Sequence, residues 1–219
     1  FIVATGGTVT CSGDYRIHTF TGPGTFTVCS ISGSAANNQV SYLVVAGGGA
    51  GGNGGCGDNA GGGGAGGFRE DKSPVTPYTA SPLEGAGAIT VTATTFPIVV
   101  GAGGATTPKQ GGAGNVSTFS TITSAGGGGG GRPGQAQGNS GGSGGGGSPF
   151  GPASDQPGGA GNTPPVSPPQ GNSGGTGKVN NPPTAAASGG GGGATQAGQN
   201  AGPFSYQAGD GGNGATTSI

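Results

Sequence analysis

The first 31 residues alternate between apolar and polar positions, as half-buried β-strands do. Short turns containing glycine separate three such runs, Thr8–Ser12, Tyr15–Phe20 and Thr25–Cys29. β-Branched and aromatic residues bounded by short turns are the usual sequence signal for strands. Because the turns are so short, the pattern predicts an N-terminal antiparallel β-meander.

A second pattern joins strands directly to glycine. Three apolar runs continue without a break into glycine runs, at Ser41–Ala46, Phe96–Val100 and Thr121–Ala125. The segment Ala215–Ile219 has the composition of a fourth strand of this kind, with no glycine run after it. No window places apolar residues at the helical spacing i, i+3, i+4, i+7. We therefore expect essentially no α-helix.

Short glycine-rich segments recur from residue 47 to the end of the chain, separated by stretches rich in Pro, Ala, Thr, Asn and Gln. Extended glycine in the polyproline II conformation has three residues per turn and no internal hydrogen bonds. Without side chains, such rods can approach until their backbone groups bond to one another, which satisfies the donors and acceptors. The sequence thus predicts a β-rich region over 1–46. It is continued by a bundle of packed polyglycine II-like rods over 47–219, with interspersed strands and loops, in one continuous domain. The alternative interpretation is a flexible linker.

Composition narrows the function classes. The 219 residues include 61 glycines and 17 prolines, and only 29% are hydrophobic and 6% charged. Ordinary globular domains are about 45–50% apolar and about 25% charged, so a conventional enzyme core is not expected. The net charge of −1 and the lack of a basic stripe argue against nucleic-acid binding. No apolar run reaches the roughly 18 residues that membrane insertion requires.

One catalytic motif occurs twice, as expected from composition alone. Gly-x-Ser-x-Gly surrounds Ser143 and Ser173, but a hydrolase needs a strand-turn-helix elbow and a histidine downstream. The single histidine, His18, lies far upstream. We expect no catalytic residues, no enzyme activity and no cofactor.

Acidic residues offer a weak candidate for calcium. The oxygen-bearing side chains considered are Asp58, Glu70, Asp71 and Glu84. Their spacing matches no calcium loop, so calcium is a low-ranking prediction and no other metal is expected.

The three cysteines allow two interpretations. Cys11 and Cys29 fall in neighbouring predicted strands, which makes them disulfide candidates and would imply an oxidising environment. Cys56 is then left over and is a candidate for a bond between subunits. The alternative is three free thiols.

The order of strand and glycine segments resembles the glycine-rich domain of tailed-phage virion proteins, which is found in tail fibres and adhesins. The resemblance covers nearly the whole chain and rests on these segments: Phe1–Thr10, Ser12–Thr21, Gly24–Val28, Tyr42–Gly49, Gly66–Arg69, Phe119–Ala125, Gln170–Asn172 and Gly174–Gly175. It implies packed polyglycine rods with variable loops at the tip. It also implies a virion structural or host-recognition role.

We therefore expect a non-enzymatic virion structural protein of the tail fibre, adhesin or surface-decoration type. Its localisation would be the virion or the extracellular space, and its loops could contact a host cell-surface receptor. The aromatic candidates for recognition are Tyr78, Phe150, Phe204 and Tyr206, since aromatic side chains give a large contact area. The cysteines and the long 71–88 stretch depart from the family pattern. They leave an alternative open, a repeating subunit of an extracellular bacterial or archaeal filament.

An assembled state is also expected. A short meander leaves a sheet edge and an apolar face that copies of the same chain or other virion proteins could cover. The assembly candidates are Phe1, Ile2, Val3, Phe20, Phe26, Tyr42 and Ile219.

Overall fold

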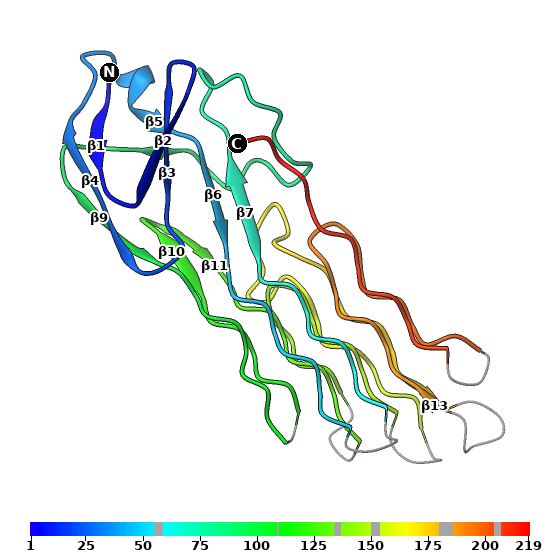
Figure 1. Ribbon diagram of the computed structural model, residues 1–219. Helices are drawn as coiled ribbons and strands as arrows, with labels where there is room; N and C mark the ends of the chain where they lie inside the picture. The colour runs from blue at the N-terminus through cyan, green and yellow to red at the C-terminus, as the bar shows by residue number, and fades with distance from the viewer. Residues whose placement is uncertain (55–58, 109, 134–136, 150–153, 180–185, 204–206) are drawn as a thin grey trace.

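The computed structural model describes residues 1–54, 59–108, 110–133, 137–149, 154–179, 186–203 and 207–219. It consists of a β head and a bundle of extended rods that runs away from the head (Figure 1). The described residues contain one helical element, the 3₁₀ turn η1 (Ala35–Asn38). The predicted all-β fold with irregular structure and essentially no α-helix is confirmed.

The head strands are β1 (Val3–Thr5), β2 (Thr8–Ser12), β3 (Tyr15–Thr19), β4 (Gly24–Ser30), β5 (Gln39–Val40), β6 (Tyr42–Val45), β7 (Phe68–Asp71), β8 (Ile89–Thr90), β9 (Thr95–Val99), β10 (Ser117–Phe119) and β11 (Ile122–Ser124). A five-stranded antiparallel sheet has the order β1-β4-β9-β10-β11. Two-stranded antiparallel ladders join β2 to β3, β5 to β8 and β6 to β7. A further ladder, β12 (Lys178–Val179) with β13 (Ala186–Ala187), lies far from the head (Figure 1).

The predicted meander is only partly correct. β2 and β3 form the expected hairpin, but β4 pairs with β1 and β9 instead of β3. The reason is burial: β4 places Phe26 directly opposite Phe96 of β9, whereas every residue of β2 is exposed. An aromatic cross-strand pair inside the core stabilises the β4–β9 ladder more than a solvent-facing pairing would.

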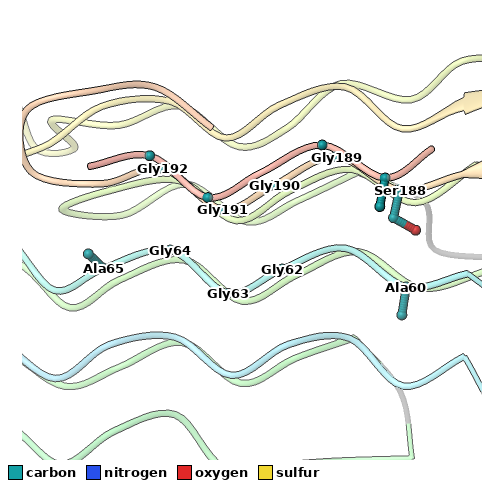
Figure 2. Close-up of a pocket in the computed structure, with 14 residues that line it drawn as sticks. Ala60, Gly62, Gly63, Gly64, Ala65, Ser188, Gly189, Gly190, Gly191 and Gly192 are labelled. Carbon is teal, nitrogen blue, oxygen red and sulfur yellow. The ribbon is translucent and has the colours of Figure 1, made fainter. Parts of the chain in front are cut away.

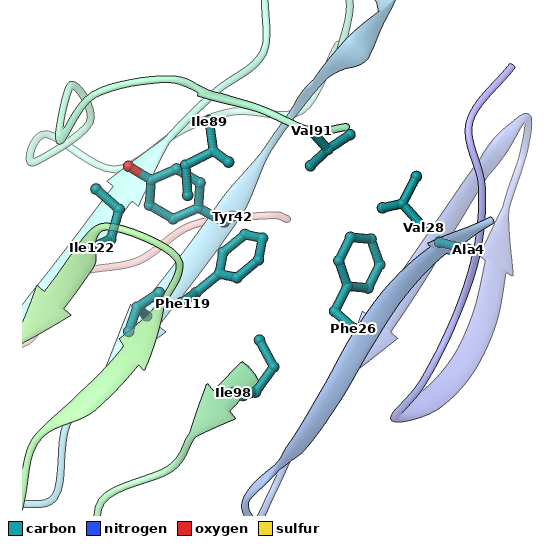
Figure 3. Close-up of a cluster of buried hydrophobic side chains, with 10 residues drawn as sticks. Ala4, Phe26, Val28, Tyr42, Ile89, Val91, Ile98, Phe119 and Ile122 are labelled. Carbon is teal, nitrogen blue, oxygen red and sulfur yellow. The ribbon is translucent and has the colours of Figure 1, made fainter. Parts of the chain in front are cut away.

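The core lies between the five-stranded sheet and the β6–β7 ladder (Figure 3). Its centre is a set of edge-to-face rings, with Phe26 and Tyr42 at 5.9 and 6.0 Å from the ring centre of Phe119. Ile89, Val91, Ile98, Ile122, Val28, Val44 and Ala4 complete it. The conventional core is thus confined to the head.

Each head strand that leads to glycine keeps its direction as it enters the bundle. The β6–β7 ladder, for example, continues through a bond from Ala46 N to Gly67 O (3.1 Å) and then Gly49 N to Gly64 O (2.8 Å). The strand and the glycine run that follows it therefore form one extended path.

The rods bond laterally with a three-residue period. In rod 61–67, the amides of Gly61, Gly64 and Gly67 donate to the carbonyl oxygens of Gly131, Gly128 and Ala125, in the antiparallel sense. The amides of Gly62 and Ala65 donate to Gly189 and Gly192 on another rod, in the parallel sense. A period of three is that of the polyproline II helix. The bundle interior is therefore hydrogen-bonded backbone.

The glycine runs at the centre of the bundle are buried. This holds for every residue of 127–131 and of 189–193. A Cβ atom built on Gly128 would lie 1.8 Å from the carbonyl oxygen of Asn139. No side chain fits at that separation, which explains why the sequence is glycine there.

The C-terminal segment is not the strand that its composition predicts. Residues 215–219 carry no strand. Instead, Ser218 N donates to Thr79 O (3.1 Å), and Thr79 N donates to Ser218 Oγ (2.9 Å). Thr217 Oγ1 also donates to Glu70 Oε1. The segment returns to the head because these polar groups fix it there.

Candidate functional site

The bundle has a head end and a far end, and lateral bonds set the level of each residue along it. Ala46, Gly67 and Ala125 are bonded to one another next to the head. Gly131 and Gly146 are bonded at the opposite end, and so are Gly147 and Gly175. The connections that leave after 52, 131, 147, 177 and 202 therefore all start at the far end (Figure 1). This clustering makes the far end the candidate recognition surface.

Described residues at the far end include a short polar contact set. Val179 N of β12 donates to Asp155 Oδ1 (3.0 Å). Gln156 and Gly177 exchange two backbone bonds of 2.8 and 2.9 Å. These contacts join residues 155–156 to residues 177–179.

Four predicted site residues, Phe150, Phe204, Tyr206 and Cys56, lie outside the described residues. The same holds for Asp58, one of the acidic residues considered for calcium.

Tyr78 does not join the far-end surface. It lies in the 72–88 loop, which packs on the head, with Lys72 Nζ 5.6 Å from its ring centre. Its hydroxyl reaches Asp71 O at 3.5 Å. Burial, reinforced by the charge of Glu70, raises the pKa of the Tyr78 hydroxyl above its ordinary value. Among the predicted recognition aromatics, the one that the structure describes therefore lies on the head.

Glu70 is a fully buried carboxylate, and sequence analysis did not foresee its role. Its Oε2 accepts a bond from Ser81 N (2.9 Å), and its Oε1 accepts one from Thr217 Oγ1. Buried charged groups are tolerated when they are hydrogen-bonded. Glu70 thereby links β7 to both the 72–88 loop and the C-terminal segment.

Asp71 and Tyr42 face each other across the β6–β7 ladder. Burial raises the pKa of the Asp71 carboxyl, while the bond from Gly87 N (2.9 Å) lowers it. Burial, and next the charge of Asp71, raise the pKa of Tyr42 to about 12. The Tyr42 hydroxyl donates to Gly87 O (2.5 Å). Both side chains thus hold the loop at Gly87 against the head.

Gln170 is a second residue that composition did not single out. It is 1% exposed, and its side-chain amide bonds to two other parts of the chain. Its Oε1 accepts from Ala125 N (2.8 Å), and its Nε2 donates to Pro164 O (2.9 Å). The only available signal was its place at the start of a glycine run, within the segment that resembled virion proteins.

The acidic residues do not form a metal centre within the described part of the chain. No three His, Cys, Asp or Glu side chains gather there in a way that could hold a metal ion. Carboxylate oxygens of Glu70 and Asp71 accept backbone N–H bonds instead. The calcium prediction gains no support from these residues.

The two serine motifs are embedded in the rods. Ser143 is fully buried, and its Oγ donates to Gly193 O (3.1 Å). Ser173 Oγ accepts from Gly161 N (3.3 Å). His18 lies in the head, where its ring packs edge-on to Phe26 at 5.1 Å and its Nδ1 is bonded to Gly6 O. The structure brings neither serine to the histidine.

The predicted disulfide is not formed. Cys11 and Cys29 are both free and exposed. Their strands are not neighbours, because β2 pairs only with β3 while β4 belongs to the five-stranded sheet. The premise of adjacent strands was therefore wrong.

The assembly candidates divide into surface and core. Phe26 and Tyr42 are buried in the core of their own chain, so they are not contact residues for another subunit. Ile2 and Phe20 are half-buried against that core. Phe1, Val3 and Ile219 are exposed. The surface candidates therefore lie at the β1 edge and at the chain end.

Comparison with known proteins adds the family. A sequence model described as a glycine-rich domain matches residues 20–219, which include β4 to β11 and all rods but not β1, β2 or β3. The chain belongs to this glycine-rich domain family. No curated protein and no solved structure matches it. Within the described residues of this glycine-rich domain, no helix is long and apolar enough to cross a membrane.

Proposed function

We propose that this glycine-rich domain is a non-enzymatic structural protein of a virion, of the tail fibre, adhesin or surface-decoration type. In this proposal the head attaches to copies of the same chain or to other virion proteins. The far end contacts a receptor on the host cell surface. The finer assignment to tailed phages rests on the sequence resemblance described above.

The observation that carries the proposal is the separation of the two ends. The apolar core and the β1 edge lie in the head, whereas the connections after 52, 131, 147, 177 and 202 start at the opposite end. Recognition residues are commonly placed on loops held by a rigid scaffold. A bundle whose rods are cross-bonded on several sides supplies that rigidity.

Adsorption of virus particles to host cells tests the proposal. Purified chain, added before particles from the culture that produces it, should reduce their adsorption. Replacing the connections between Gly147 and Pro157 and between Gly177 and Ser188 by short Gly-Ser linkers should remove this competition. A matched control changes the exposed hairpin tip at Asp14 to Asn and should compete like the unchanged chain. Equal competition by the linker variant would contradict the proposal.

A second candidate is a repeating subunit of an extracellular filament. The specific observation in its favour is the edge strand β1, with Val3 and the neighbouring Phe1 exposed. Free strand edges recruit partner strands. Immunogold labelling of the producing culture separates the two: label on virus particles supports the first candidate, and label along particle-free filaments supports the second.

A further inference from the structure

Rod 188–194, the central rod, is bonded to five other rods. Its carbonyl oxygens are fully used over 188–193. They accept from rod 61–67 at Gly189 and Gly192, from 172–175 at Gly190 and Gly193, and from 209–212 at Ser188 and Gly191. Its amides, by contrast, donate to only two rods. Gly189 and Gly192 donate to rod 141–147, and Gly190 and Gly193 donate to rod 196–202.

The two remaining amides, those of Ser188 and Gly191, point to a third side of the rod. They donate to no backbone acceptor among the described residues. The place of this unbonded side around the central rod follows from the bonds between the neighbouring rods. Rod 141–147 is bonded to both 61–67 and 171–177, so it lies between them around the central rod. Rod 196–202 is likewise bonded to both 171–177 and 207–214. The remaining gap therefore lies between 207–214 and 61–67.

A groove of about 470 Å³ occupies that gap (Figure 2). It is lined by 62–65, by 188–192 and by residues 208, 209, 211 and 212, with Ala60 at one end. Its walls are almost bare backbone, because the lining side chains are those of Ala and Ser only. Three rods border this position, so it has the surroundings of one further rod in the bundle.

The groove also holds polar groups without partners. Ser188 is 6% exposed, and its Oγ has no hydrogen-bond partner. Neither the N–H nor the C=O of Gly63 forms a backbone bond among the described residues. A polar group that is buried and unpaired, as the Ser188 hydroxyl is, destabilises the folded chain. A ligand that supplied partners along the groove would therefore be stabilised there.

We propose that the groove receives one extended glycine-rich segment of another polypeptide chain, in the polyproline II conformation. Amides three residues apart on the central rod are separated by about 9 Å, from the ~3.1 Å rise per residue. An extended chain of the same period presents acceptors at that spacing, whereas a compact small molecule does not. The inference concerns a different surface from the far end and does not depend on a virion role.

The outer rod 207–214 indicates which sequence fits. Cβ atoms on Gly209 and Gly212 would each lie 1.9 Å from a carbonyl oxygen of rod 196–202. Asp210 and Asn213, between and after them, are exposed. A segment in the groove should likewise have glycine where it faces the rods and polar residues where it faces water.

The probe is a soluble peptide with three Gly-Gly-Asn repeats and a lysine at each end, added to the full ¹⁵N-labelled chain. We expect the amide signals of Gly63 and Gly191 to shift and hydrogen exchange at Gly191 to slow at least tenfold. A peptide with Ala-Ala-Asn repeats should not bind, because its methyl groups cannot approach the rods. Equal binding of both peptides, or no change at millimolar peptide, would overturn the proposal.

A variant pair tests the position. In Gly211→Leu, the new Cβ has one neighbour, Gly191 O at 3.8 Å, so the chain can fold while the side chain fills the groove. It should weaken peptide binding at least tenfold. In Gly103→Leu, the nearest atom is Gly48 O at 3.7 Å, on a rod that does not border the groove. This control should bind normally, and equal binding by both variants would refute the site. Protection of Gly191 in concentrated protein alone, abolished by Gly211→Leu, would identify a second copy as the source of the segment.

Discussion

Substituting Gly128 by alanine tests whether backbone packing limits stability. The added Cβ would lie 1.8 Å from Asn139 O and 3.0 Å from Gly145 N. Real Cβ contacts essentially never fall below 3.0 Å. One rod must therefore move away by more than an ångström.

The cost can be worked from the bonds that this movement disturbs. Asn139 O accepts from Gly145 N (2.9 Å), and Asn139 N donates to Gly129 O (2.8 Å). Losing two buried hydrogen bonds costs about 1–3 kcal/mol each if the groups stay unpaired. Alanine also lowers the conformational entropy of the unfolded chain, which stabilises the folded state by only about 0.4–1 kcal/mol. The expected net loss is on the order of 3 kcal/mol, or a fall in Tm of roughly 6–12 °C for a chain of this size.

Thermal unfolding followed by circular dichroism or calorimetry measures this effect. The matched control is Gly103→Ala, whose Cβ would have its nearest neighbour at 3.7 Å on an exposed rod. It should leave Tm unchanged or raise it slightly. If Gly128→Ala unfolds at the same temperature as the control, the rods are not packed at contact distance and the reasoning fails.

Three further predictions concern side chains. Burial holds the pKa of Asp71 above its ordinary range, so its contribution to stability is present at acidic pH and is lost as pH rises through the folded pKa. The free energy of unfolding of Asp71→Asn, measured by urea titration, should therefore rise relative to that of the parent chain as the pH increases from about 3 to 7. A difference that does not change with pH would contradict this. Tyr42→Phe removes the bond to Gly87 O and should cost about 1 kcal/mol, read from the denaturation midpoint, with an unchanged midpoint as the opposing result. Gln170→Leu leaves Ala125 N unpaired and should cost about 1–3 kcal/mol in the same assay; a loss below about 1 kcal/mol would mean that stability does not depend on this side chain.

Local patterns predicted the elements but not all of their partners. The strand over Tyr42–Val45 follows from its apolar run, and the buried rod over 127–131 follows from glycine. Both signals act within a few residues. The partner of β4 is decided by where Phe26 can be buried, which depends on β9, about 70 residues further along. The meander prediction failed for that reason.

Long-range polar contacts were equally hidden. The burial of Glu70 and Gln170 depends on donors supplied by distant residues, namely Ser81, Thr217 and Ala125. Such pairings have no local signature, since any exposed carboxylate or amide has the same sequence context. The C-terminal segment was assigned as a strand because its hydroxyl contacts with Thr79 and Glu70 could not be foreseen.

The most direct measurement of a backbone core is amide hydrogen exchange of single glycines by NMR. Gly128 N donates to Ser143 O (2.8 Å) and Gly192 N donates to Gly144 O (2.8 Å), both inside the bundle. We predict that these amides exchange at least about 10³-fold more slowly than in an unstructured chain, as expected for groups that open only with unfolding. They should be as protected as Val28 N, which donates to Thr94 O in the head. Exchange of Gly128 and Gly192 at the rate of an unstructured chain, while Val28 stays protected, would contradict the rod bundle.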